Sequence, residues 1–167
     1  MAISTSARII PGYRIDNIPR KKVDYVLTLK PRNNPVDSIQ AESTLLGLRR
    51  TWHDAAANHT DFIPIASRPV AASIKTKRDD GHTQKAALQI GIWQTGQWKF
   101  LLNKARPDAL KKLSFLPGIV VHGHRWCFVA TTYTNSKTTL WTKTKFRKIS
   151  TPLGTLQAIK GLREINA

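Results

Sequence analysis

The first half of the chain changes from strand-like to helix-like spacing of its hydrophobic residues and back again. The run at 23–29 is rich in β-forming residues and predicts a strand. Asp37 or Ser38 can cap a helix that runs to about residue 56, because the apolar residues that follow lie close to helical spacing. A short apolar run at 71–77 then predicts a second strand. The pattern so far is strand, helix, strand.

The second half begins with a long helical pattern and continues with strands. Residues 82–104 predict a helix that glycine at 91 or 96 could interrupt, and a short helical piece follows between Pro107 and Pro117. Further strands are expected at 118–123, 125–132 and 138–144, and a terminal helix at 153–165. Asn135 and Ser136 are typical of the hairpin turn between the last two strands. Such an order favours an α/β fold with a small mixed sheet flanked by helices.

Length supports a single domain with a short N-terminal extension. The chain has 167 residues, of which 41% are hydrophobic, enough to bury one core. Residues 1–19 are polar and broken by prolines and a glycine, so they are expected to form an N-terminal arm. Residues 20–167 are expected to form the domain.

The charge of the chain is strongly positive and points to a polyanionic partner. There are 27 Lys and Arg against 10 Asp and Glu, which gives a formal net charge of +17. An excess of this size attracts polyanions, so nucleic acid is the first partner to consider. A small anionic ligand is the alternative. No single basic amphipathic helix is evident, so a membrane surface is not expected.

The single cysteine and the lack of long apolar segments indicate an intracellular protein. Cys127 cannot form a disulfide within the chain and is read as a small core residue, which fits a reducing compartment. No run approaches the roughly 20 apolar residues that span a bilayer. The first residues lack the apolar core of a signal peptide. The expected location is cytoplasmic or nuclear.

Two lysines stand in the apolar strand at 71–77. Because side chains two apart on a strand point the same way, Lys75 and Lys77 project from one face. They could be solvated lysines of an edge strand, which discourage aggregation. They could instead line a cleft with Asp24, at the start of the preceding strand.

The ordered set of motifs resembles the PD-(D/E)XK nuclease superfamily, and more narrowly its fungal nuclease-like proteins. The resemblance covers roughly residues 20–163. Its segments are Lys22–Tyr25, Asn58–Thr60, Arg68–Arg78, Ala87–Trp93, Phe115–His124, Phe128–Thr132, Leu140–Thr142 and Gly154–Gly161. It implies a restriction-endonuclease-like three-layer core. In this superfamily an aspartate and a second acid hold Mg²⁺, which activates a water for phosphodiester hydrolysis, and a lysine assists.

Carried over by position, the resemblance assigns four candidate catalytic residues. Asp24 matches the first aspartate and Lys77 the motif lysine, while Gln89 matches the helix glutamine of a Q-x-x-x-Y element with Trp93 in the aromatic place. Lys75 stands where the pattern has glutamate. Asp24 alone would hold Mg²⁺ weakly or not at all, since that ion needs a shell richer in oxygen ligands.

Other side chains could complete or extend this site. Glu42 on the preceding helix or Asp79 just after the strand could supply a missing carboxylate. Four basic residues near the motif are candidates for contacts with nucleic acid or another ligand. They are Lys22, Arg78, His122 and His124. The two histidines, spaced by two, could instead be ordinary hydrogen-bonded side chains.

Three functions follow from these alternatives. The first is a nuclease-fold protein that binds DNA through a basic cleft, with impaired or lost phosphodiester hydrolysis. The second is a metal-independent enzyme that acts on a small anionic or carbonyl substrate, with Lys75, Lys77 and Asp24 as its catalytic residues. Neighbouring ammonium groups disfavour each other's charged form, so a neutral lysine could act as a base or form a Schiff base. The third is an intact Mg²⁺-dependent nuclease that uses Glu42 or Asp79.

Overall fold

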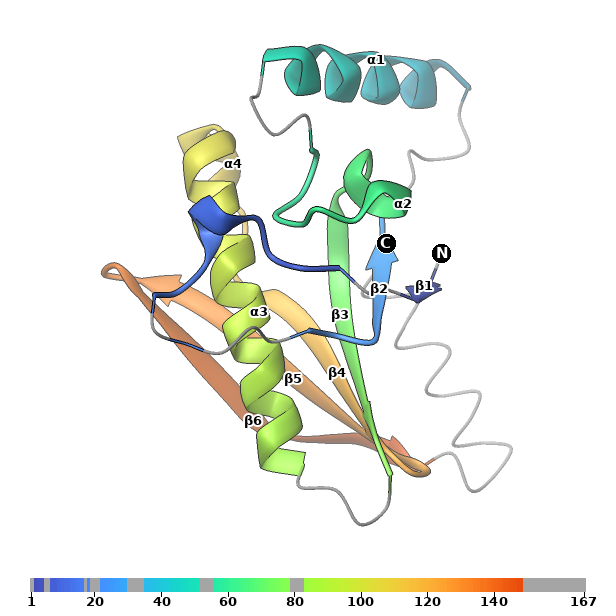
Figure 1. The fold of residues 1–167 in the computed structure, drawn as a ribbon, viewed down its shortest axis with the longest axis vertical. Coiled ribbons are helices and arrows are strands. Elements are labelled where there is room, and N and C mark those ends of the chain that lie inside the picture. The colour runs from blue at the N-terminus through green and yellow to red at the C-terminus, as the bar shows by residue number, and fades with distance from the viewer. Residues whose placement is uncertain are drawn as a thin grey trace.

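The protein is built around one mixed sheet of six strands that follow one another in sequence order (Figure 1). The computed structural model describes residues 2–4, 7–16, 18, 22–29, 35–51, 56–78 and 83–148. The strands are β1 (Ala2–Ser4), β2 (Tyr25–Thr28), β3 (Val70–Lys77), β4 (Leu116–His122), β5 (Arg125–Thr134) and β6 (Lys137–Lys148). β3 and β4 pair in parallel, and the other neighbours pair antiparallel.

A long helix, α3, lies across one face of this sheet (Figure 1). The helices are η1 (Pro11–Tyr13), α1 (Pro35–Thr51), α2 (Ile63–Ala66), α3 (Thr83–Lys104) and α4 (Pro107–Lys111). Parallel neighbours need a crossover connection, and α3 with α4 supplies it between β3 and β4. This arrangement confirms the expected α/β class with a mixed sheet flanked by helices. No helix in the described ranges is long and apolar enough to cross a bilayer.

Most of the expected elements are present, with shifted ends. The helix predicted from Asp37 or Ser38 to about residue 56 is α1, which begins at Pro35 and ends at Thr51. β1 and α2 were not predicted, because three and four residues are too few to show a periodic pattern. The hairpin turn is confirmed, since Asn135 and Ser136 have φ of 50° and 61°. The terminal helix predicted at 153–165 lies outside the described residues.

Neither glycine of α3 interrupts the helix; each allows a close approach. A Cβ at Gly91 would lie 3.3 Å from Leu140 of β6. A Cβ at Gly96 would lie 3.1 Å from both Ile9 Cγ2 and the Tyr13 carbonyl oxygen. The two glycines therefore let β6 and the N-terminal segment pack closely against α3.

The N-terminal residues expected to form an arm are packed against the domain. β1 pairs with β2, and Ala7, Ile9 and Tyr13 are buried in the main core. The Tyr13 ring meets the Phe100 ring of α3 edge to face, with centroids 5.3 Å apart. The described part of this segment thus adds apolar surface to the same core as α3.

Buried polar side chains also join α3 to the sheet. Gln94 Nε2 donates to the Pro117 carbonyl at 2.8 Å, and its Oε1 accepts from Thr131 Oγ1 at 2.9 Å. Trp98 Nε1 donates to the same Thr131 oxygen at 3.1 Å, and Gln97 Nε2 donates to the Val70 carbonyl at 2.9 Å. These directional bonds fix how the helix sits on β3, β4 and β5.

From their hydrophobic character, four tryptophans are expected to lie mostly in the core, namely Trp93, Trp98, Trp126 and Trp141, and the structure confirms this only in part. Trp93 and Trp98 are buried, and Trp126 is half-buried. Trp141 is 58% exposed, so its placement in the core was wrong. It stands on β6, one of the two edge strands of the described sheet, where its Nε1 donates to Thr132 Oγ1 at 3.0 Å.

Candidate functional site

Lys75 and Lys77 project from the face of β3 that α3 covers. Ser73 shares that face with both lysines, because side chains alternate along a strand. Its register partner is Gly118 of β4, where a Cβ would lie 2.8 Å from Ile90 of α3. The lysine pair therefore faces the helix side of the sheet.

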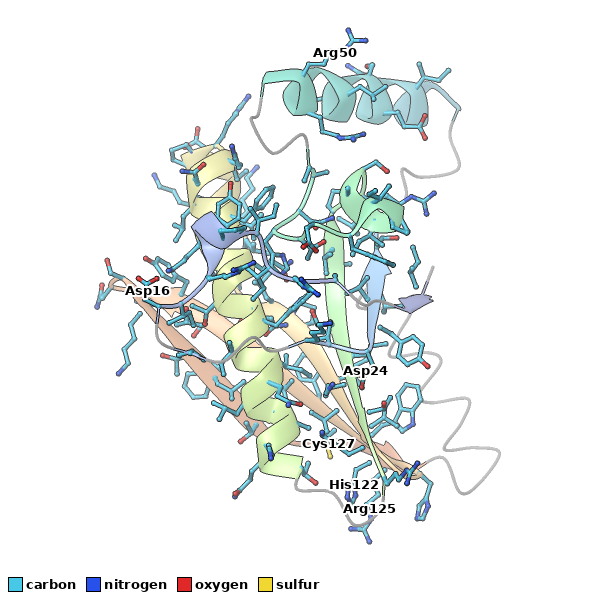
Figure 2. All side chains as sticks on the ribbon, in the orientation of Figure 1. Asp16, Asp24, Arg50, His122, Arg125 and Cys127 are labelled. Atoms are coloured by element: carbon cyan, nitrogen blue, oxygen red, sulfur yellow. The ribbon has the colours of Figure 1, made fainter. Side chains whose placement is uncertain are left out.

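Asp24 lies one residue before β2 and is held against β3 (Figure 2). Its backbone N–H donates to the Ile74 carbonyl at 2.9 Å. Lys75 Nζ donates to Asp24 Oδ1 at 2.7 Å, which forms an ion pair. Thr76 donates to the other carboxylate oxygen twice, from its backbone N–H at 2.7 Å and its hydroxyl at 2.8 Å.

These contacts keep the Asp24 carboxylate ionised. Burial of the group raises its pKa, but the hydrogen bonds from Lys75 and Thr76 and the positive charge of Lys75 together hold the pKa below its ordinary value of 3.8. The Lys75 side chain is 13% exposed and that of Asp24 is 32% exposed. The pair is therefore partly shielded from water, where charge-assisted bonds are stronger than at an open surface.

The described residues around Asp24 do not form a carboxylate-rich metal site. Nowhere in the described ranges do three His, Cys, Asp or Glu side chains group as metal ligands. Both Asp24 oxygens already accept hydrogen bonds, one of them from an ammonium group. This donor set does not fit Mg²⁺, which takes oxygen ligands and is repelled by a cation.

Two carboxylates, Glu42 and Asp79, were the candidates to complete a metal site with Asp24. Glu42 is exposed on α1, which lies beyond the Val70 end of β3, away from Lys75 and Lys77 (Figure 1). Asp79 lies outside the described residues. The structure therefore does not bring Glu42 to Asp24.

Lys77 lies beside two other basic side chains, His122 and Arg125, at the end of the sheet. Lys77 is the register partner of His122 on β4, and His122 is the register partner of Arg125 on β5. Figure 2 shows His122 and Arg125 together at the end of the molecule where α3 begins. His122 Nε2 is buried and has no hydrogen-bond partner within the described part of the chain.

Gln89 lies in the second turn of α3, the helix over the lysine face. The side chain is half-buried, and its Oε1 is buried without a hydrogen-bond partner among the described residues. The structure gives no hydrogen bond from Gln89 to Asp24 or Lys75. Its predicted part in the site remains a prediction.

The remaining candidates are exposed around this end of the sheet. Lys22 precedes Asp24 by two residues, Arg78 follows β3 directly, and His124 lies in the tight turn between β4 and β5. All three are exposed and available to a ligand. Cys127 is half-buried and packs against the core, as expected for a small apolar residue.

Two residues of this region were missed in the sequence. Thr76 stands between the lysines and was read only as a strand residue, because nothing in a sequence shows that its N–H and hydroxyl meet a carboxylate 52 positions away. Arg125 could have been found. A two-residue turn at Gly123 and His124 places residue 125 opposite residue 122.

The comparisons with known proteins agree with this architecture. The model of a family described as the PD-(D/E)XK nuclease superfamily matches residues 1–167. Neither the curated proteins nor the solved structures contain a match. Because the family match spans the whole sequence, the chain belongs to the PD-(D/E)XK nuclease superfamily.

Proposed function

We propose that the protein binds nucleic acid, most readily DNA, through the basic side chains around Asp24 and the end of β3. We further propose that metal-dependent phosphodiester hydrolysis is impaired or lost. The observation that carries this proposal is the 2.7 Å ion pair between Lys75 and Asp24. In the superfamily pattern, the position of Lys75 is that of the second metal-binding acid. Here it carries the opposite charge and bonds to the first.

Loss of the second acid affects catalysis more than binding. A divalent ion in such a site polarises the phosphate and lowers the pKa of the attacking water. With Lys75 bonded to Asp24, an ammonium group neutralises the carboxylate that an ion would need. Binding through phosphate contacts requires no ion, because lysine and arginine neutralise phosphates directly.

The charge of the molecule supports nucleic acid as the partner. The formal net charge is +17. Three exposed basic residues lie close to the site in sequence: Lys22 just before Asp24, Arg78 just after β3, and Arg125 at the start of β5. Such a surface raises the association rate and affinity for any polyanion, with a strong dependence on salt.

The direct test is a binding titration with the full chain. Fluorescently labelled 20-nucleotide single-stranded and duplex DNA are titrated at low salt, once with EDTA and once with Mg²⁺. We expect binding in both conditions, a logarithm of the affinity that falls linearly with the logarithm of the salt concentration, and intact DNA after prolonged incubation with Mg²⁺.

Two outcomes would contradict the proposal. Undetectable binding at low salt would remove the nucleic-acid partner. Cleavage that requires Mg²⁺ and disappears in an Asp24→Ala variant would show that the metal site still works and that the Lys75 ion pair opens during catalysis.

A further inference from the structure

We propose that Lys77, His122 and Arg125 form a phosphate-binding row that is separate from the Asp24–Lys75 pair and holds the backbone phosphates of the bound nucleic acid. This inference rests on the proposed function and adds where the strand is held. It assigns His122 and Arg125 a binding role in one site with Lys77, across three neighbouring strands.

The row is set by strand register. Lys77 pairs with His122 in the parallel β3–β4 ladder, and His122 pairs with Arg125 in the antiparallel β4–β5 ladder. Register partners project from the same face of a sheet, and neighbouring strands lie about 4.8 Å apart. The three side chains therefore start from backbone positions that span about 10 Å in a line perpendicular to the strands.

A tight turn fixes this end of the sheet. The backbone at Gly123 has φ of 54°, a left-handed conformation that glycine adopts without strain. Its N–H donates to the Lys77 carbonyl at 3.1 Å, which ties the β4–β5 turn to the end of β3. The row is thus held by backbone hydrogen bonds on both sides of His122.

The donors of Lys77 and Arg125 are available to an anion. The structure gives no ion pair for Lys77, His122 or Arg125 within the described part of the chain. Asp24, which lies against β3, is already bonded to Lys75 and Thr76. The lysine and arginine therefore keep their hydrogen-bond donors for a ligand.

The histidine adds a reason for an oxygen-rich ligand. His122 Nε2 is buried without a partner in the described ranges, and leaving a buried polar group unpaired costs about 1–3 kcal/mol. The residue as a whole is only half-buried, so a turn of its ring would bring Nε2 to a phosphate oxygen, whose acceptance of the hydrogen bond would remove that cost. Arginine beside it can bind a phosphate through two parallel N–H donors.

The test compares two charge-matched double variants in the DNA titration. Lys77→Gln with Arg125→Gln removes two charges from the row. Lys111→Gln with Lys112→Gln removes two charges from exposed residues at α4, at the opposite end of α3. Because each phosphate contact contributes about one unit to the salt slope, we expect the row variant to lower that slope by about 2 and the α4 variant to leave it nearly unchanged.

His122 is tested alone because it can act without a full charge. His122→Ala is expected to weaken binding at fixed salt by at least about 3-fold, while Asn103→Ala, at an exposed position in the last turn of α3, serves as its control. Circular dichroism melting of each variant separates lost binding from lost folding.

The outcomes distinguish this inference from the proposed function. If the unmodified protein does not bind DNA, the proposed function fails. If it binds, but the row and α4 variants lose equal affinity and equal slope, binding is spread over the whole basic surface and the row is wrong. Equal losses from His122→Ala and Asn103→Ala would remove His122 from the row.

Discussion

The charge at position 75 decides what Asp24 can do. A glutamate there would give two carboxylates at the same place, which repel each other until a cation joins them. The lysine instead neutralises Asp24 and, with Thr76, occupies both of its oxygens. One side chain thereby converts a possible cation site into a closed ion pair.

Lys75→Glu is expected to create a divalent-metal site. In EDTA the variant should lose about 1–3 kcal/mol of unfolding free energy, because it replaces a partly buried ion pair with two like charges. Mn²⁺ or Mg²⁺ should restore stability by binding the folded state. Thermal melting with and without the ion, supported by calorimetry, measures both effects.

The control for this change is Lys75→Met, which removes the ammonium group without adding a carboxylate. It should be destabilised in EDTA and should not respond to the ions. If Lys75→Glu also failed to respond, the superfamily motif would be misaligned on β3.

At the residue scale, the expected proximity of Asp24 to the lysine strand is observed, but the individual contacts could not be predicted. Placing Asp24 beside the lysine strand was possible because the superfamily pattern fixes their order along the chain. The pattern does not say which lysine bonds the aspartate, nor that Thr76 does so twice, because those contacts depend on side-chain reach across β2 and β3.

At the scale of elements, α3 depends on the absence of a side chain at Gly118. A Cβ there would lie 2.8 Å from Ile90 Cγ2 and 2.9 Å from Val129 Cγ2. Gly118→Ala should therefore overpack the contact between α3 and the sheet and destabilise the protein by about 1–3 kcal/mol in urea unfolding.

Gly47→Ala is the matched control. It makes the same change in α1, where a Cβ would meet nothing within 4 Å. It should be neutral or stabilise by up to about 1 kcal/mol, because alanine favours helix. Similar effects of both substitutions would contradict a tight contact at Gly118.

His59 makes the packing of α3 sensitive to acid. The ring is fully buried and meets Trp93 edge to face with centroids 4.7 Å apart, and burial lowers its pKa to about 3. In the unfolded chain a histidine has a pKa of about 6.5, so between these values the unfolded state binds a proton that the folded state does not. Stability is therefore fully present above pH 6.5 and is lost as the pH falls towards 3, by up to about 1.4 kcal/mol per pH unit.

His59→Phe tests this by keeping an aromatic ring against Trp93 and removing the titration. Urea unfolding of both proteins at several pH values from 7.5 to 4.5 should show a difference in free energy that grows as the pH falls. A difference that stays constant with pH would mean that His59 accepts its proton in the folded state.

Most long elements could be predicted from sequence, and the short ones could not. The spacing in α3 and the β-forming runs of β3 to β6 are strong local signals. β1 depends on pairing with β2, and the burial of Tyr13 depends on Phe100, so both follow from contacts between distant residues. Trp141 was misplaced for a related reason, since hydrophobic character alone does not show that β6 leaves it 58% exposed.

At the scale of the whole molecule, composition and topology act separately. The net charge of +17 is a property of the chain whether or not it is folded, and it favours any polyanion. The mixed sheet instead requires the folded order of β2, β3, α3 and β4. Charge alone therefore predicts attraction to polyanions, while the fold sets where the proposed phosphate-binding row lies.

The parallel pairing of β3 with β4 has a consequence for the order of folding. The β4–β5 and β5–β6 hairpins join neighbours in sequence, so their ends meet early and at little entropic cost. β3 must wait for β4, because Lys77 and His122 are separated by the whole of α3 and α4. A newly made chain would thus carry its full positive charge before the proposed phosphate-binding row has formed. During that interval the chain would bind polyanions non-specifically. Pairing of β3 with β4 would then bring the residues of the proposed row together.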